Sequence, residues 1–241
     1  MKQLMPDNTR LVLQAERFAR YRQRAAGFLR QQLPWFTPAA LPDDRLNRAI
    51  AEAYALSHAA GLRAEADHLK YLYAAGYWGI GFATDPQYGA ALAEAGCGAD
   101  GPMPIEPALK ALARWQAPIA GELAGELSGG QAIFHALLDL AEGPRPTPDG
   151  LAAGIAVIWP ARARHLPGGV LAQVIAAAAA EFAAPQAALN GQAVHAVLAL
   201  HLGCAFRRDP FLPWADKAAS DGFELIRGFT EYLKMMGQVA A

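Results

Sequence analysis

Apolar residues recur at three- and four-residue steps along most of the chain, and this spacing places them on one face of an α-helix. The first such stretch runs from about Asn8 to Leu33, with arginines between its apolar positions. Further stretches with helical spacing or helix-end signals cover about 42–61, 64–81, 105–117, 119–141, 148–159 and 221–236. No segment alternates apolar and polar residues between hairpin turn signals, as a half-buried strand would. The pattern predicts an all-α protein.

Two parts of the chain carry the same landmarks in the same order. Leu-Pro at 41–42 and Leu-Pro at 166–167 each precede a helical stretch that ends in the spacing Gly-x-x-Phe-x-x-Asp-Pro. The residues of the two motifs are Gly79, Phe82, Asp85 and Pro86, and Gly203, Phe206, Asp209 and Pro210. An internal duplication explains this order, and chance similarity between Ala-rich helices is the alternative.

The duplication predicts a helical bundle of two similar units joined by a middle helical segment. A first unit is expected at 1–95 and a second at 147–241, with a linker and middle helices at 96–146. Gly and Pro are frequent at both boundaries, where they favour turns over helix.

Aspartate followed by proline is typical of a helix N-terminus, where the carboxylate caps a free N–H and proline lacks one. Capping accounts for both residues of each pair, whereas a paired-carboxylate acid–base site accounts only for the aspartates. We therefore interpret Asp85 and Asp209 as caps. Removing either is expected to destabilise the fold by about 1 kcal/mol.

The histidines and serines do not fall into a recognised catalytic or metal-binding spacing. His195 and His201 are six positions apart and point in different directions on a straight helix. Ser57 has only its neighbour His58 close in sequence, and adjacent helical residues point apart. Glu65-x-x-His68 occurs without the second copy that a di-iron bundle needs. We expect no catalytic residue, no metal, no cofactor and no enzymatic activity.

Composition and the absence of long apolar runs predict a folded protein of the cytoplasm. Of the 241 residues, 54% are hydrophobic and 18% are charged, which excludes a disordered chain. No apolar run reaches about 18 residues, and the N-terminus lacks the apolar stretch of a signal peptide. The two cysteines, Cys97 and Cys204, have no paired spacing. A cytoplasmic protein without a membrane span or a disulfide is expected.

Charge is distributed unevenly, which favours a protein partner. Residues 1–70 hold 11 Lys and Arg against 7 Asp and Glu, whereas residues 71–150 hold 3 against 9. The excess is too small, and too poor in interleaved aromatic residues, for a nucleic-acid surface.

Two groups of residues near the N-terminus are candidates for binding such a partner. Arg17, Arg20 and Arg24 lie outside the expected buried stripe, either as a solvated basic face or as a docking surface. Trp35 and Phe36 stand beside prolines, either as an exposed anchor or as a plug of the core.

The segment 59–72 and the two Gly-x-x-Phe-x-x-Asp-Pro motifs resemble a family of small helical proteins encoded in bacterial type VI secretion operons, beside spike proteins and toxic effectors. The family pattern often continues as Pro-Trp-Ala, which Pro213-Trp214-Ala215 matches, whereas the first motif has Gln87-Tyr88 instead. The resemblance implies a non-catalytic accessory role. Such a protein would be an adaptor, an effector chaperone or an immunity-type partner of a secreted effector or spike component.

A second hypothesis is a helical carrier or enzyme with an apolar cavity between the two units. The chain combines the small side chains of Ala176–Ala180 with large aromatic side chains at other positions, and such a mixture can leave a pocket. The large residues are Tyr71, Tyr73, Tyr77 and Trp78.

Overall fold

The computed structural model confirms the all-α class, and no strand occurs among the residues it describes. Those residues are 7–98, 101–128, 130–144, 146–181, 191–217 and 222–240. The first half of the chain forms α1 (Asp7–Gln32), α2 (Asp43–Ala59), α3 (Glu65–Trp78), η1 (Phe82–Thr84), η2 (Pro86–Tyr88), α4 (Gly89–Glu94) and α5 (Ile105–Gln116). The second half forms η3 (Ala117–Ile119), α6 (Ala120–Ser128), α7 (Gly130–Glu142), α8 (Pro148–Ile158), α9 (Pro160–His165), α10 (Val170–Glu181), α11 (Gly191–Leu202), η4 (Phe206–Arg208), α12 (Pro213–Lys217) and α13 (Gly222–Ala240).

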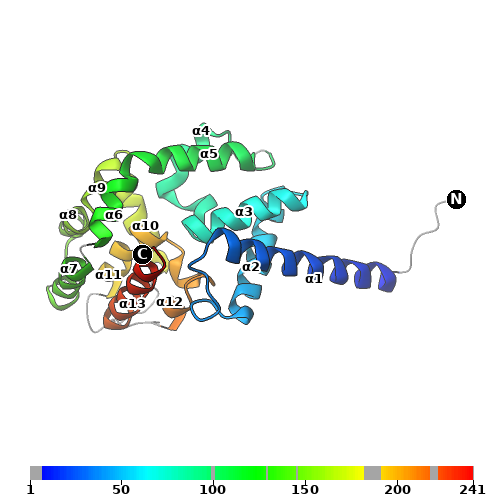
Figure 1. Ribbon diagram of the computed structural model, residues 1–241. Helices are drawn as coiled ribbons and strands as arrows, with labels where there is room; N and C mark the ends of the chain where they lie inside the picture. Colours follow the sequence, from blue (N-terminus) through cyan, green and yellow to red (C-terminus); the bar gives the residue numbers. More distant parts are fainter. Residues whose placement is uncertain are drawn as a thin grey trace.

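The two halves have separate hydrophobic cores. The first core lies among α1, α2, α3 and α5, and the second lies among α7, α8, α10, α11 and α13. Figure 1 shows the two groups of helices side by side, with α5 running from the first toward the second. Trp115, near the end of α5, packs against both cores. Phe211 comes from the second half but belongs to the first core, so the chain crosses between them.

Local chemistry sets several of the helix ends. Gly61 adopts a φ of +85° after α2, a left-handed turn that suits glycine. The Thr147 hydroxyl accepts a 3.1 Å hydrogen bond from the Gly150 N–H and caps α8. The helix expected over 119–141 is described as two elements, α6 and α7, and Gly129 between them lies outside the described residues. Pro185, a residue type that predicts the end of the helix before it, also lies outside them.

The aspartates of the two Gly-x-x-Phe-x-x-Asp-Pro motifs cross between the halves. Asp85 Oδ2 accepts a hydrogen bond of 2.6 Å from the Cys204 N–H, next to the glycine of the second motif. Asp209 Oδ2 accepts one of 2.8 Å from the Ile80 N–H, next to the glycine of the first. Each motif therefore supplies the acceptor for the other.

The second oxygen of each aspartate holds the turn in which the aspartate lies. Asp85 Oδ1 accepts from the Gln87 N–H at 3.1 Å, and Asp209 Oδ1 accepts from the Phe211 N–H at 2.9 Å. Both carboxylates are buried. The expected helix cap is therefore present at Asp85, which caps η2, whereas Asp209 holds a turn at the end of η4 and no helix begins directly after it. Each carboxylate also makes the crossing bond, which capping does not describe.

The two motif glycines allow the halves to approach closely. Gly79 and Gly203 have φ values of +94° and +93°, a backbone conformation that residues other than glycine rarely adopt. A Cβ on Gly79 would lie 3.0 Å from the Leu202 carbonyl oxygen, and one on Gly203 would lie 3.4 Å from that of Trp78. The local geometry at the two motifs is thus the same, as a duplication would require. The similarity of the two whole units stays a prediction.

We predict that Asp85→Ala destabilises the protein by about 2–4 kcal/mol, because it leaves two buried backbone N–H groups without acceptors. Urea denaturation measures this loss. Asp44→Ala is the control, since Asp44 lies exposed in the first turn of α2 and should change stability by less than about 0.5 kcal/mol. A loss of only about 1 kcal/mol for Asp85→Ala would indicate an ordinary cap without the crossing bond.

Candidate functional site

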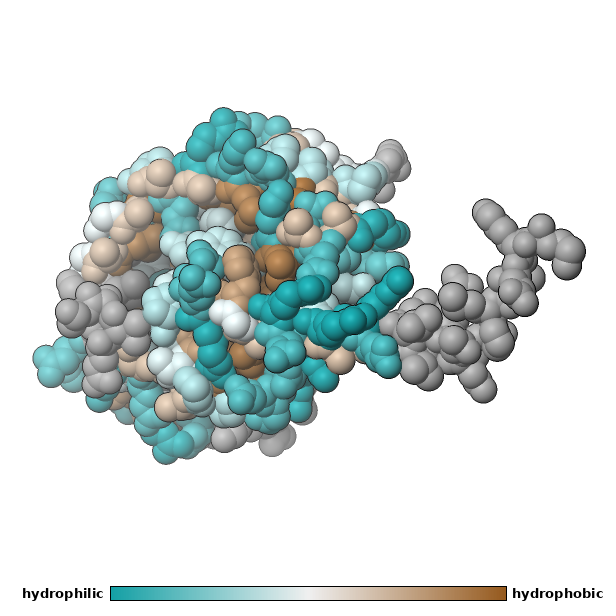
Figure 2. Space-filling model, turned by 45° about the vertical axis from the view of Figure 1, so that its right-hand side comes forward, coloured by the Kyte–Doolittle hydropathy of each residue, from teal (hydrophilic) through white to brown (hydrophobic). Residues whose placement is uncertain are grey.

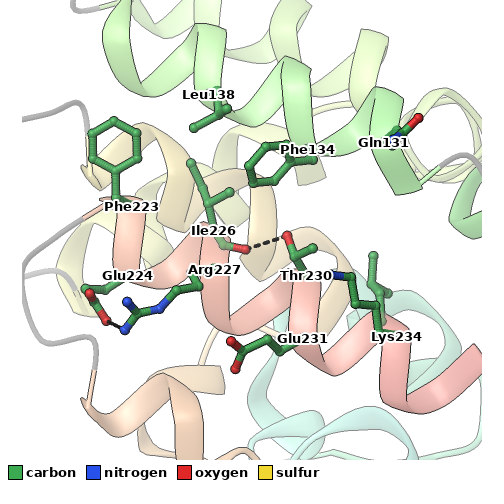
Figure 3. Close-up of a pocket in the computed structure, with 11 residues that line it drawn as sticks. Gln131, Phe134, Leu138, Phe223, Glu224, Ile226, Arg227, Thr230, Glu231 and Lys234 are labelled. Atoms are coloured by element: carbon green, nitrogen blue, oxygen red, sulfur yellow. Dashed lines mark hydrogen bonds and ion pairs between the residues drawn. The ribbon is translucent and has the colours of Figure 1, made fainter.

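An apolar groove of about 770 Å³ runs between α7 and α13. Phe134 and Leu138 line it from α7, and Phe223, Ile226 and Leu233 line it from α13. Figure 3 shows Phe134 and Leu138 pointing toward Ile226 across the seam between the two helices. These apolar residues are four positions apart on α7, and three and seven positions apart on α13, so each set lies on one face of its helix.

The groove is open although its floor belongs to the second core. Ile226 is 1% exposed, whereas Phe223 is 39% exposed, an unusual fraction for a phenylalanine on the apolar stripe of a helix. An exposed aromatic residue beside a concave apolar surface is typical of an interaction site. The face shown in Figure 2 has brown hydrophobic side chains in hollows between teal hydrophilic ones, so apolar surface is also accessible elsewhere.

The edge of the groove carries charges of both signs along α13. Glu224 and Arg227 form an ion pair one turn apart, and the Thr230 hydroxyl donates a hydrogen bond of 2.8 Å to the Ile226 carbonyl (Figure 3). Glu231 and Lys234 follow on exposed positions. This edge therefore offers one negative and one positive side chain to whatever occupies the groove.

The expected partner-binding residues of the first half lie elsewhere. Arg17 and Arg20 are exposed on α1, and Arg24 is engaged in a 2.7 Å ion pair with Glu65 of α3. All three arginines are exposed, and their role in docking a partner stays a prediction.

The two candidate aromatic anchors lie against the protein itself. Trp35 is half-buried and packs beside Tyr77, with 6.3 Å between ring centroids. Phe36 is 5% exposed and stacks on Phe211, with ring centroids 5.0 Å apart and planes 6° from parallel. A partner could not contact Phe36 without displacing this stack.

The motif residues are internal rather than exposed. The aspartates make the crossing bonds beside the two glycines, and each phenylalanine is 1% exposed in the core of its own half. Trp214 packs against the second core beside Phe229, and Gly228 faces its ring so closely that a Cβ would not fit. These nine residues shape the scaffold.

One serine–histidine contact was not visible from sequence spacing. Ser57 Oγ lies 2.6 Å from His68 Nδ1, eleven positions later and on the next helix. Ser57 Oγ also lies 2.8 Å from the Tyr54 carbonyl oxygen, so its single proton serves either that carbonyl or His68 Nδ1, according to the histidine tautomer. Ser57 is fully buried. The contact joins α2 to α3.

Metal ligands do not gather in the described part of the chain, where no three His, Cys, Asp or Glu side chains are grouped to hold an ion. Neither Cys97 nor Cys204 forms a disulfide. None of the helices in the described ranges is both long and apolar enough to cross a membrane.

Comparison with known proteins identifies no relative: no family model matches the chain, and no curated protein or solved structure is significantly similar to it.

Asp209 has the most strongly altered acidity among the motif residues. Burial raises its pKa from 3.8 to about 7, although its hydrogen bonds from the Ile80 and Phe211 N–H groups act in the opposite direction. The negative charge of Glu52 adds a smaller upward contribution. In the folded state Asp209 therefore holds its proton over a pH range in which it would be ionised in the unfolded chain.

We predict that Asp209 makes the folded protein less stable as the pH rises from about 4 to about 7. The folded state binds the proton more tightly, so its advantage is complete below the unfolded pKa of 3.8 and lost above about 7. The free energy of unfolding of the parent, minus that of Asp209→Asn, should decrease across this range by up to about 1.4 kcal/mol per pH unit. Urea denaturation at several pH values measures it. A difference that is constant or rises with pH would show that the hydrogen bonds outweigh burial.

Proposed function

We propose that the protein is a non-catalytic accessory that binds another protein through the α7–α13 groove. The observation that supports this most directly is the open apolar floor of the groove, with Phe223 exposed at its edge. The resemblance to accessory proteins of type VI secretion operons makes a secreted effector or a spike component the proposed partner, and the cytoplasm the proposed place of binding.

The dimensions of the groove suit an amphipathic helix. Phe223 and Lys234 mark its two ends on α13 and are eleven positions apart, which corresponds to about 16 Å along a helix axis. That length accepts about three turns of a partner helix, with apolar anchors at positions i, i+3 or i+4, and i+7. The volume of about 770 Å³ is sufficient for several large side chains to enter.

The charged edge adds a condition on the partner. Glu231 and Lys234 are exposed and close to the apolar floor. A partner helix with a basic residue opposite Glu231 and an acidic residue opposite Lys234 would be favoured over one with the reverse order. Such rim charges contribute more to selectivity and to the rate of association than to affinity.

We predict that the protein co-elutes in size-exclusion chromatography with a product of a neighbouring gene of its operon when the two are co-expressed. Phe223→Glu should weaken this complex by roughly tenfold or more, because it places a charge in the apolar groove. Leu56→Glu is the matched control, since Leu56 is 37% exposed on α2 of the other half and should leave the complex intact.

Two results would contradict the proposal. If every neighbouring product elutes separately from the parent protein, the accessory role fails. If a complex forms but Phe223→Glu retains it while keeping the parent's urea denaturation midpoint, the partner binds on another surface.

A further inference from the structure

A second cavity, of about 380 Å³, lies between the two halves, where a carrier would need one. Trp78 of the first half and Leu123 and Phe211 of the second contribute apolar walls. Tyr88, Arg162 and His201 contribute polar groups to the same space. The cavity is therefore mostly apolar, with a small number of polar side chains on its wall.

Arg162, on α9, is a buried cation without a carboxylate partner in the described structure. It is 5% exposed, and its Nε and Nη1 groups have no acceptor among the described residues. Its guanidinium lies over the Trp115 ring at 5.2 Å and shares a hydrogen bond with the Tyr88 hydroxyl. A buried guanidinium with unused donors is costly, and the donors it presents fit a carboxylate.

The groups around Arg162 leave its charge uncompensated. Burial, reinforced by the positive charge of Arg162, lowers the pKa of His201 to about 3, so this histidine is neutral. Its Nδ1 atom also lacks a partner in the described part of the chain. Asp209 lines the cavity too, but its two oxygens accept from the Ile80 and Phe211 N–H groups. The cavity therefore contains a cation and a second unused polar atom close to it.

We propose that this cavity binds a small organic acid, with its single carboxylate on Arg162 and its apolar body against Trp78, Leu123 and Phe211. A single negative charge is indicated because Arg162 is the only Lys or Arg among the described residues that line the space. The carboxylate would accept a charge-assisted hydrogen bond from one of the two donors without a partner, Arg162 Nε or Nη1. This inference goes beyond protein binding and does not depend on the α7–α13 groove.

The first test uses octanoate and its uncharged counterpart 1-octanol as probes in isothermal titration calorimetry with the full-length protein. Octanoate should bind at least roughly tenfold more tightly than 1-octanol, because only octanoate offers Arg162 a charged acceptor. Equal binding of the two, or no binding of octanoate, would overturn the proposal. This comparison uses the parent chain and does not depend on any variant folding.

The second test asks whether the octanoate carboxylate binds to Arg162. Arg162→Met should lose at least roughly tenfold in octanoate affinity while binding 1-octanol like the parent, and Arg162→Lys should bind octanoate with intermediate affinity. Arg164→Met is the matched control, because Arg164 lies on the same helix but is exposed and paired with Glu122. Unchanged octanoate binding by a folded Arg162→Met would overturn the assignment. None of these variants should alter co-elution with a protein partner, which separates this inference from the proposed function.

Discussion

The crossing of Asp85 and Asp209 is the constraint on which the arrangement of the two halves depends. Each carboxylate accepts one N–H from its own turn and one from the turn of the other half. A carboxylate buried without such donors would be strongly unfavourable, and the N–H groups it satisfies would be equally unfavourable alone. If the halves separated, the two carboxylates would lose the Ile80 and Cys204 N–H donors, and those N–H groups would lose their acceptors. Because the two halves are held in this way, the cavity between them has defined walls.

The same crossing gives the most conspicuous sequence feature a structural role. A motif of glycine, phenylalanine, aspartate and proline attracts a functional interpretation because it occurs twice. In the structure its residues make internal contacts: the phenylalanines pack in the cores, and the glycines allow the backbones of the two halves to approach closely. The surfaces proposed to bind other molecules come from less distinctive sequence, namely the apolar stripes of α7 and α13 and Arg162 of α9.

The parts of the fold that depend on neighbouring residues could be predicted, and those that depend on distant ones could not. The helix expected over Asn8–Leu33 is observed as Asp7–Gln32, because a periodic apolar pattern is a local signal. Capping by Asp85 is local as well, whereas its bond to Cys204 spans 119 positions and leaves no trace in spacing. Sequence shows the apolar stripe of α13 but not that Phe223 is 39% exposed. Nor does it show that Arg162 is buried while Arg164, two positions later, is exposed.

The reach of the crossing bonds also bears on how the chain is made. The Ile80 N–H is synthesised 129 residues before the Asp209 carboxylate that accepts from it. Until the second motif leaves the ribosome, the Ile80 amide lacks its acceptor within the protein, and the apolar surface that later receives Phe211 is exposed. The nascent first half therefore exposes apolar surface that favours association with other chains. This surface is covered once the second half has been synthesised and packs against it.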